Sequence, residues 1–310
     1  MAAEIPPLPP RKTVVQVFAD FLKYLMECTT TYINDTHPNS QDLWDSLKGN
    51  VAFVLSHPNG WEGLEQSQMR QAAVASKIIE DTTAGHAKLS FVTEGEASLH
   101  FAIEHGVLSE ALKPGDGIVV VDAGGGTVDV SAYKQTKMSG GTVLEEVVAP
   151  QCFFQGSVFV ALRARMFLQC MSLSPPGSPS RLTPKLPAHL ANSDYLSDLD
   201  HICKCFDENT KIRFKNENDP QFIKFGSTKD NDANVNIRFG QLKLTGKDVA
   251  QFFEPSVKCI IDAVEEQMTK SSCKITVGLV FSSYSDPGSI SYSMSCLSVD
   301  SQRANGCSIV

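Results

Sequence analysis

The sequence predicts a layered α/β fold. Segments whose apolar residues recur at helical spacing alternate with short apolar or alternating segments that are typical of strands. Ile118 to Val121 is an unbroken apolar run of strand length, as expected for a strand covered on both faces. With 310 residues and 42% apolar side chains, the chain can bury the core of one large or two ordinary domains.

Each element is predicted by its own pattern. The first helix, at 13–33, carries Val14, Phe18, Phe21 and Leu25 near helical spacing, and the segment 37–40, His-Pro-Asn-Ser, ends it. Further helices are predicted at 64–79, 94–105, 157–168, 198–209 and 246–268. Strands are predicted at 51–55, 89–92, 142–149, 222–225, 235–239 and 275–281, together with a hairpin at 118–133.

Charge and composition exclude several classes of partner. The net charge is −8 and there are no basic blocks, which argues against nucleic acid or an anionic membrane as the main partner. No apolar run approaches the roughly 18 residues of a membrane helix, and the first ten residues lack the apolar region of a secretory signal. The 9 cysteines are scattered without a Cys-x2-Cys pair. We therefore expect reduced thiols and a cytoplasmic location.

The segment 117–131 is the most informative motif, because glycines follow the buried strand. It is not a Walker loop, since no lysine follows the glycines before Lys134. It is not a Rossmann fingerprint, because Asp129 stands at the third glycine position and the following residues alternate with period two. The pattern predicts two strands joined by a glycine turn. A plain glycine-rich turn is the alternative without function.

This hairpin has the chemistry of a phosphate site. Gly124, Gly125 and Gly126 can adopt positive φ and leave no Cβ between backbone N–H groups and a ligand. Such a turn can present a concave nest of N–H donors. Asp122 would repel phosphate directly, so its carboxylate indicates Mg²⁺ or a water between them. Thr127 can donate its hydroxyl to a phosphate oxygen, or can simply be a β-branched strand residue.

The run from Asp122 to Ser131, Asp-Ala-Gly-Gly-Gly-Thr-Val-Asp-Val-Ser, resembles the second phosphate motif of the actin-like ATPase superfamily. The similarity is greatest to DnaK-type (heat-shock protein 70-type) chaperones, in a divergent fungal branch. Segments 53–61, 91–100 and 155–157 resemble other parts of that family in order and spacing. The resemblance covers about 11–170 and 195–270, and implies an actin-like (ribonuclease H-like) fold that binds ATP or ADP with Mg²⁺.

The resemblance also implies a set of site residues. In that family a carboxylate at the position of Glu94 lies near the metal-bound water, whereas an acid favoured at a helix N-terminus is the alternative. Asp122 would hold Mg²⁺ through water, and Asp129 is expected to be structural. The residues expected to contact nucleotide are Gly124, Gly125, Gly126, Thr127, Gly156, Glu208 and Lys211. Glu208 and Lys211 can instead form an exposed helical ion pair, and Gly156 an ordinary helix start.

The domain organisation follows from these assignments. A proline-rich tail (1–12) precedes the rest of a first actin-like lobe (13–116), and the second lobe starts with the phosphate hairpin (117–171). A Ser/Pro-rich insertion (172–193) interrupts this lobe, which continues over 194–280 and is followed by an irregular tail (281–310). The first lobe is expected to be incomplete and the C-terminal end degenerate. The family's first hairpin, Asp-x-Gly-Thr-Thr, is not found before Thr13, nor is Gly-Gly found after Phe281.

Two functions remain open at this point. One is an ATP-binding, heat-shock-like protein whose ATP hydrolysis is weak or lost, with client or co-chaperone proteins as partners. The other is an inactive relative that acts only as a protein-interaction module. Phosphoryl transfer depends on positioning, so losing one of two phosphate hairpins should damage turnover severely.

Overall fold

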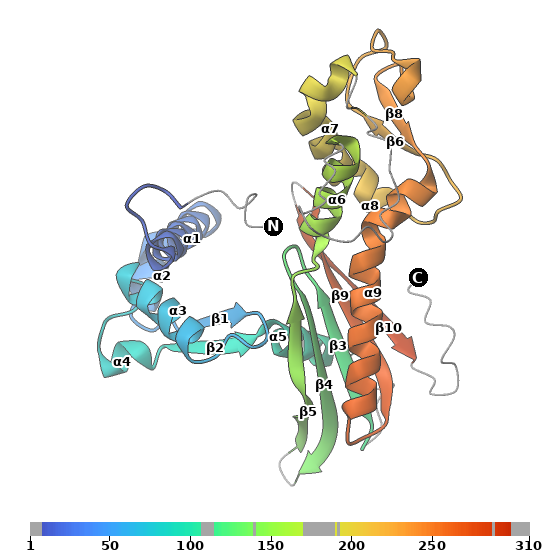
Figure 1. The fold of residues 1–310 in the computed structure, drawn as a ribbon. Coiled ribbons are helices and arrows are strands. Elements are labelled where there is room, and N and C mark those ends of the chain that lie inside the picture. The colour runs from blue at the N-terminus through green and yellow to red at the C-terminus, as the bar shows by residue number, and fades with distance from the viewer. Residues whose placement is uncertain are drawn as a thin grey trace. The chain divides into compact units, whose positions relative to one another are not determined.

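The computed structural model describes residues 8–106, 115–138, 141–169, 190, 193–286 and 289–298. Their helices and sheets combine parallel and antiparallel strands, so the predicted mixed α/β class is confirmed. The chain divides into a first unit, residues 1–100, and a second unit, residues 101–310 (Figure 1). None of the helices within the described ranges is long and apolar enough to cross a membrane.

The first unit is built from helices around a short parallel sheet. Thr13 and Gln16 form a capping box that starts α1, and this helix confirms the prediction at 13–33. Its elements are α1 (Val14–Thr36), α2 (Ser40–Leu47), β1 (Phe53–His57), α3 (Leu64–Ala75), α4 (Thr83–His86), β2 (Leu89–Thr93) and the start of α5 (Glu94–Glu104). Strands β1 and β2 pair in parallel, and α1 packs against α3. Their shared core contains Leu22, Ala72 and Leu89.

The second unit contains a five-stranded sheet. Its strands are β3 (Gly117–Ala123), β4 (Val128–Met138), β5 (Gly141–Phe153), β9 (Ile275–Asp286) and β10 (Ser289–Ser298). They lie in the order β10-β9-β3-β4-β5, in which β3 and β9 are parallel and the other neighbours antiparallel. The predicted hairpin and the predicted strands at 142–149 and 275–281 are confirmed.

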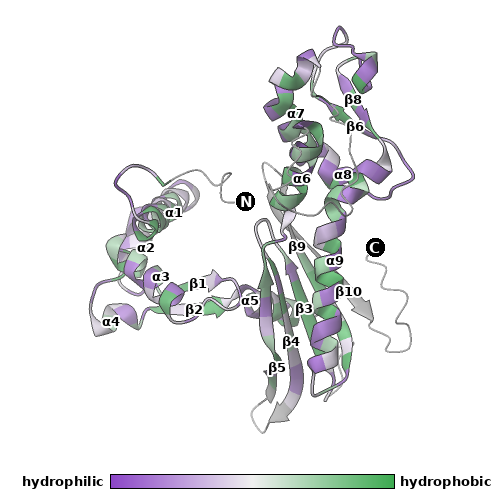
Figure 2. Cartoon of the chain, in the orientation of Figure 1, coloured by the Kyte–Doolittle hydropathy of each residue, from purple (hydrophilic) through white to green (hydrophobic). Residues whose placement is uncertain are grey.

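Helix α9 (Gly246–Lys270) contributes to two hydrophobic clusters of the second unit. Thr245 and Asp248 cap its start. Ala263, in its C-terminal half, packs with valines of β3 and β4, whereas Val249 and Phe252 belong to the other cluster. Pro255 lies in the helix between these two contact regions. Hydrophobic and hydrophilic residues alternate along its surface (Figure 2), as an amphipathic helix requires.

The cluster that contains Val249 and Phe252 joins helices to a small antiparallel sheet. Its residues come from α6 (Ser157–Gln169), α7 (Leu199–Cys205), a π-helix η2 (Phe206–Thr210), β6 (Gln221–Lys224), β7 (Ile237–Arg238), β8 (Gln241–Leu244) and α9. Two 3-10 turns, η1 (Asp194–Asp198) and η3 (Ala233–Val235), complete it. The short helix α8 (Lys211–Arg213) follows η2. The helix predicted at 198–209 therefore changes from α to π geometry within its length. Strand β8 was not predicted.

The irregular tail predicted from residue 281 is wrong as far as Ser298. Strand β9 continues to Asp286, and β10 pairs with it antiparallel over its full length. The cause is visible in the sequence 289–296, where serine alternates with Ile, Tyr, Met and Cys. This is a period-two strand pattern, which the serine-rich composition obscured. Most of the predicted insertion at 172–193, and residues 1–7 of the predicted tail, lie outside the described residues.

Candidate functional site

The predicted phosphate hairpin is formed by β3 and β4. Ile118 to Val121 are almost fully buried, and the strand emerges at the half-buried Asp122. The register pairs Asp122 with Asp129 and Ala123 with Val128. The Gly124 N–H donates to the Thr127 carbonyl at 2.9 Å, which closes the turn. A buried strand thus carries an acidic residue and a glycine turn to the surface.

The glycines of this turn are not required by backbone conformation. None of Gly124, Gly125 and Gly126 has a φ in the left-handed region, so the turn does not use the positive φ that glycine permits. A Cβ built on Gly125 or Gly126 would meet no atom within 4 Å. Neither strain nor packing in the described structure therefore calls for glycine at these two positions. Close approach of a ligand to the backbone is the remaining reason for glycine at these two positions.

Three successive backbone donors of the turn are available to such a group. Within the described residues, the N–H groups of Gly125, Gly126 and Thr127 donate to no other atom of the chain. Gly125 and Gly126 are exposed, and Thr127 is half-buried. Consecutive N–H groups on an open turn form the kind of concavity that holds an anion.

The opposite side of the turn is fixed by the start of α6. The N–H groups of Gly156, Ser157 and Val158 donate to the carbonyls of Gly126, Gly124 and Gly125, at 3.2, 3.1 and 2.9 Å. A Cβ on Gly156 would lie 2.5 Å from the Gly125 oxygen, which is closer than real Cβ contacts. Gly156 is therefore required by the approach of the turn itself. The first amides of α6 are occupied by these carbonyls.

Two carboxylates face each other at the base of the turn. Asp122 and Asp129 are direct cross-strand partners, so their side chains share one face of the sheet, and Asp129 is 1% exposed. Ser131, two residues further along β4 on that face, has a buried hydroxyl oxygen with no hydrogen-bond partner among the described residues. Like charges placed opposite each other are unfavourable unless a cation or proton separates them.

Asp129 is expected from the sequence to be structural, and its pairing with Asp122 was not predicted. Period two had placed it one step beyond Thr127, which made it look remote from the turn. Counting back across the hairpin from the glycines pairs it with Asp122, and this signal was available in the sequence. Mg²⁺ is commonly bound through one or two carboxylates and several waters, so the pair fits a hydrated divalent cation. The described residues hold no group of three or more His, Cys, Asp or Glu side chains suited to a metal.

Lys211 reaches the start of α6, but it is not paired with Glu208. Its ammonium bonds to the carboxylate of Asp207 and lies 3.4 Å from the Ser157 carbonyl oxygen, and its side chain is only 14% exposed. Glu208 lies 3.8 Å from Lys204 instead. The structure therefore brings Lys211 next to the helix start that holds the glycine turn, and leaves Glu208 out of that contact.

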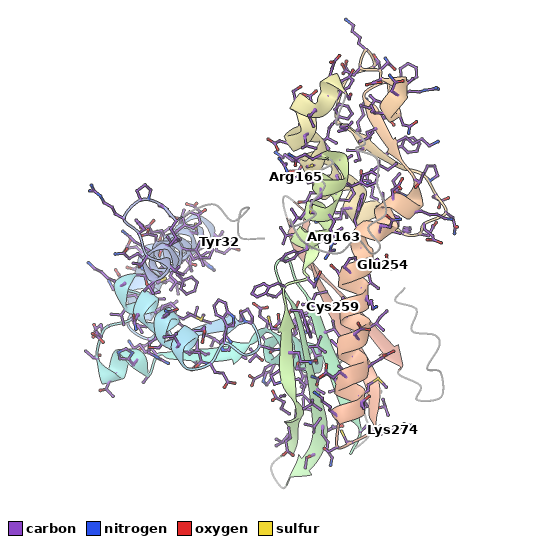
Figure 3. All side chains as sticks on the ribbon, in the orientation of Figure 1. Tyr32, Arg163, Arg165, Glu254, Cys259 and Lys274 are labelled. Atoms are coloured by element: carbon purple, nitrogen blue, oxygen red, sulfur yellow. The ribbon has the colours of Figure 1, made fainter. Side chains whose placement is uncertain are left out.

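Arg163 ties the same helix start to α9, and sequence reasoning missed this residue as well. Its guanidinium donates to the Phe252 carbonyl at 2.7 Å, to the Ser256 hydroxyl at 3.0 Å and to the Gln155 side-chain oxygen. Arg163 is labelled in Figure 3. Burial lowers the pKa of Arg163 from its usual value. A lone arginine in a helical segment gives no sequence signal for such a contact.

Glu94 lies in the first unit, whereas the hairpin residues all lie in the second. It is the first residue of α5 and directly follows β2, as predicted. A carboxylate at this position interacts favourably with the positive end of the helix dipole. Its expected role near the water of hydrolysis stays a prediction.

Comparison with known proteins assigns the chain to no family. No protein-family model matches the sequence, and no significant match to a curated protein is found. The function is therefore inferred from the hairpin, its glycine turn and the helix that holds it.

Proposed function

We propose that this chain is an ATP-binding, heat-shock-like protein of the actin-like ATPase superfamily, which binds ATP or ADP with Mg²⁺ at the β3–β4 hairpin. One observation carries the proposal. Gly125, Gly126 and Thr127 present three available N–H groups on a turn where the two glycines have open space in place of a Cβ. The mixed α/β architecture and the strand–turn–strand hairpin support the same superfamily.

Different residues around the turn would bind the phosphate groups and the Mg²⁺ ion of the nucleotide. The N–H groups of Gly125, Gly126 and Thr127, with the Thr127 hydroxyl, would bind phosphate oxygens. Asp122 and Asp129 would hold Mg²⁺ through its water ligands. When bound, Mg²⁺ neutralises phosphate charge. The contact of Gly156 with the turn fixes the direction in which the three donors point.

Lys211 and Glu94 have supporting roles in this proposal. Lys211 is close to the α6 start and is mostly buried, so it is suited to contact the nucleoside more than an exposed helical lysine would be. Glu208 retains an expected nucleoside contact only if its side chain leaves Lys204. Glu94 would orient the water for hydrolysis. Client or co-chaperone proteins remain the proposed partners.

We propose that hydrolysis by this chain is weak or lost. The sequence holds one hairpin of the phosphate type, at 122–127. Phosphoryl transfer depends on groups that position the phosphates and the attacking water, so a single hairpin gives binding more readily than turnover. ATP turnover comparable to that of an intact member of the superfamily, and abolished in Asp122→Ala, would overturn this part of the proposal.

A specific observation also favours the alternative of an inactive protein-interaction module. The first amides of α6 are bound by the carbonyls of the glycine turn, so they are not available to phosphate. In that case the turn only joins the β3–β4 hairpin to α6, and no ligand occupies the open space beside Gly125 and Gly126.

Thermal unfolding with nucleotide separates these two functions. Mg²⁺-ATP at several millimolar should raise the melting temperature of the second unit, because a ligand that binds only the folded state stabilises it. Gly125→Ala should fold as the wild-type does and lose most of that rise, because its methyl group fills the space where phosphate would lie. No rise in the wild-type protein would exclude nucleotide binding. An equal rise in Gly125→Ala would exclude this turn as the site.

A further inference from the structure

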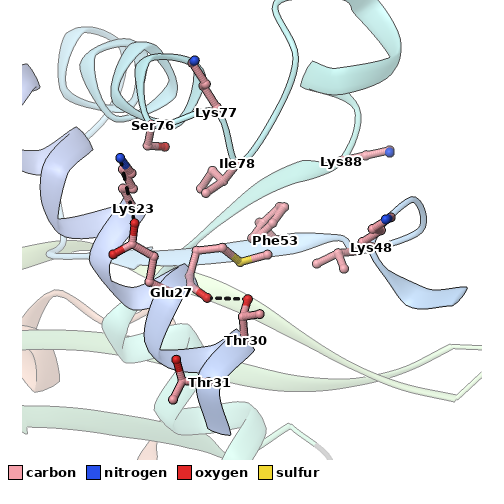
Figure 4. Close-up of a pocket in the computed structure, with 12 residues that line it drawn as sticks. Lys23, Glu27, Thr30, Thr31, Lys48, Phe53, Ser76, Lys77, Ile78 and Lys88 are labelled. Atoms are coloured by element: carbon pink, nitrogen blue, oxygen red, sulfur yellow. Dashed lines mark hydrogen bonds and ion pairs between the residues drawn. The ribbon is translucent and has the colours of Figure 1, made fainter. Parts of the chain in front are cut away.

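We propose that the first unit has a second, independent binding site, for an acidic peptide segment of a partner protein. The site is a pocket of about 480 Å³ between α1, the end of α2, α3 and the sheet. It is lined by Lys23, Met26, Glu27, Thr30, Thr31, Lys48, Val51, Phe53, Ser76, Lys77, Ile78 and Lys88 (Figure 4). It lies within the first unit and shares no residue with the glycine turn.

The charge of this pocket is opposite to that of the chain. Four lysines and one glutamate line it, a net of three positive charges, whereas the whole chain carries −8. Lys23 lies 3.9 Å from Glu27, Lys48 bonds to Asp45, and Lys88 donates to the Gly49 carbonyl. Such local concentration of one sign attracts a ligand of the other.

Of the four lysines that line the pocket, Lys77 is the one without a partner in the part of the chain that the structure describes. Within the described residues its ammonium has no hydrogen-bond or ion-pair partner. It is also strained, because it follows the end of α3 with φ of 65°. This is the C′ position of a helix, where glycine is usual and a residue with a Cβ is unfavourable. The strain at Lys77 and its unpaired ammonium leave one charge at the edge of the pocket available to a ligand.

The arrangement of the lysines indicates an extended ligand. Lys23, Lys48, Lys77 and Lys88 stand at separate points around the pocket, with Phe53 and Ile78 between them (Figure 4). A single phosphate would need donors that converge on one point. Separate cations around an apolar centre fit a peptide that has several acidic side chains and an apolar one between them.

A peptide is favoured over nucleic acid and over an anionic membrane. Nucleic-acid sites are strongly basic over a broad surface, whereas this chain is acidic overall. The pocket contains lysine and no arginine, and Glu27 would repel a continuous phosphate backbone. Its apolar residues Met26, Val51, Phe53 and Ile78 fit one aliphatic or aromatic side chain.

The test uses the full chain and a fluorescein-labelled peptide, Glu-Asp-Glu-Leu-Glu-Asp-Glu, followed by fluorescence anisotropy. Lys77→Gly should weaken binding about two- to fivefold, which is the effect of losing one exposed ion pair. Lys77→Arg should retain binding, because it keeps the charge. Lys12→Asn removes the same charge outside the pocket in the same unit and should change affinity little. Binding should also weaken as salt is added.

Lys77→Gly should fold as the wild-type chain does, because glycine suits the left-handed backbone at residue 77. A loss of peptide binding therefore cannot be attributed to unfolding. Its melting temperature should equal or exceed that of the wild-type chain while its peptide affinity falls. The proposal is overturned if the peptide does not bind, if Gln-Asn-Gln-Leu-Gln-Asn-Gln binds equally well, or if Lys77→Gly binds as the wild-type does. Tighter binding of a single-stranded RNA, or of vesicles containing phosphatidylserine, would replace the peptide with that class of ligand.

Discussion

Replacing Gly156 with alanine should destabilise the second unit strongly. The new Cβ would lie 2.5 Å from the Gly125 oxygen, 2.6 Å from the Gly126 carbonyl carbon and 2.7 Å from the Gly124 oxygen. All three are backbone atoms, so no flexible side chain can move aside. The glycine turn must separate from α6, and the three hydrogen bonds between them are lost or stretched.

The magnitude follows from those three bonds. A typical intramolecular hydrogen bond contributes about 1 kcal/mol to stability, which gives about 3 kcal/mol for the three. For a unit of this size, 1 kcal/mol changes the melting temperature by about 2–4 °C, so the expected decrease is about 6–12 °C. This is a large part of the roughly 5–15 kcal/mol that a domain has in total.

The chain provides an internal control for the assay. Its two tryptophans, Trp44 and Trp61, both lie in the first unit. Urea unfolding followed by tryptophan fluorescence therefore reports mainly on that unit, whereas circular dichroism also reports on the helices and sheets of the second. Gly156→Ala should shift a circular-dichroism transition and leave the fluorescence transition in place.

Gly125→Ala is the matched variant. It adds the same methyl group one hydrogen bond away, but into open space, so it should change stability by less than about 0.5 kcal/mol without nucleotide. The reasoning is refuted if Gly156→Ala stays within about 1 kcal/mol of the wild-type chain, or if both variants lose equal stability.

Three further predictions concern charged groups. Asp122→Asn should stabilise the metal-free chain by up to about 1 kcal/mol, by removing a like charge opposite Asp129, and should abolish any stabilisation by Mg²⁺ in thermal unfolding. Arg163→Met should cost about 1–3 kcal/mol in urea unfolding, and Arg163→Lys should restore only part of it, because lysine cannot reach three acceptors in different directions. Hydrogen bonds from the Ser227 N–H and hydroxyl lower the pKa of Asp230, so its stabilising effect is present above the pKa of the unfolded chain and is lost as pH falls through the folded value. Asp230→Asn should therefore make acid unfolding less steep, whereas an unchanged pH profile would show that this carboxylate does not contribute.

The sequence predicted best the elements that have strong periodicity. Helix α1 and the β3–β4 hairpin follow directly from apolar spacing and from period two, and both are found as predicted. Strand β10 was missed because its serines resemble an irregular tail by composition, although they alternate with apolar residues. Strand β8 was also missed, although its four residues alternate between polar and apolar as a half-buried strand does.

For the candidate site, the sequence predicted the position of the turn correctly, but not which side chains contact each other around it. The turn and its acidic neighbour were placed correctly, but the reason for the glycines was not conformational freedom. Lys211 pairs with Asp207 in place of Glu208, because η2 is a π-helix and side-chain directions within it differ from those of an α-helix. Contacts between distant segments, such as Arg163 with Phe252, depend on tertiary packing that no local pattern encodes.

The proline in α9 has a mechanical consequence for the second unit. Pro255 has no N–H to donate, so the helix lacks one backbone bond at the point where it passes from one cluster to the other. Bending is easiest at such a point. Arg163 donates a hydrogen bond to the helix there, at the Phe252 carbonyl, and another to the side chain of Gln155. Gln155 directly precedes Gly156, which contacts the glycine turn. A change in the glycine turn is therefore expected to reach α9 through Gln155 and Arg163, beside Pro255, where the helix has one backbone donor fewer.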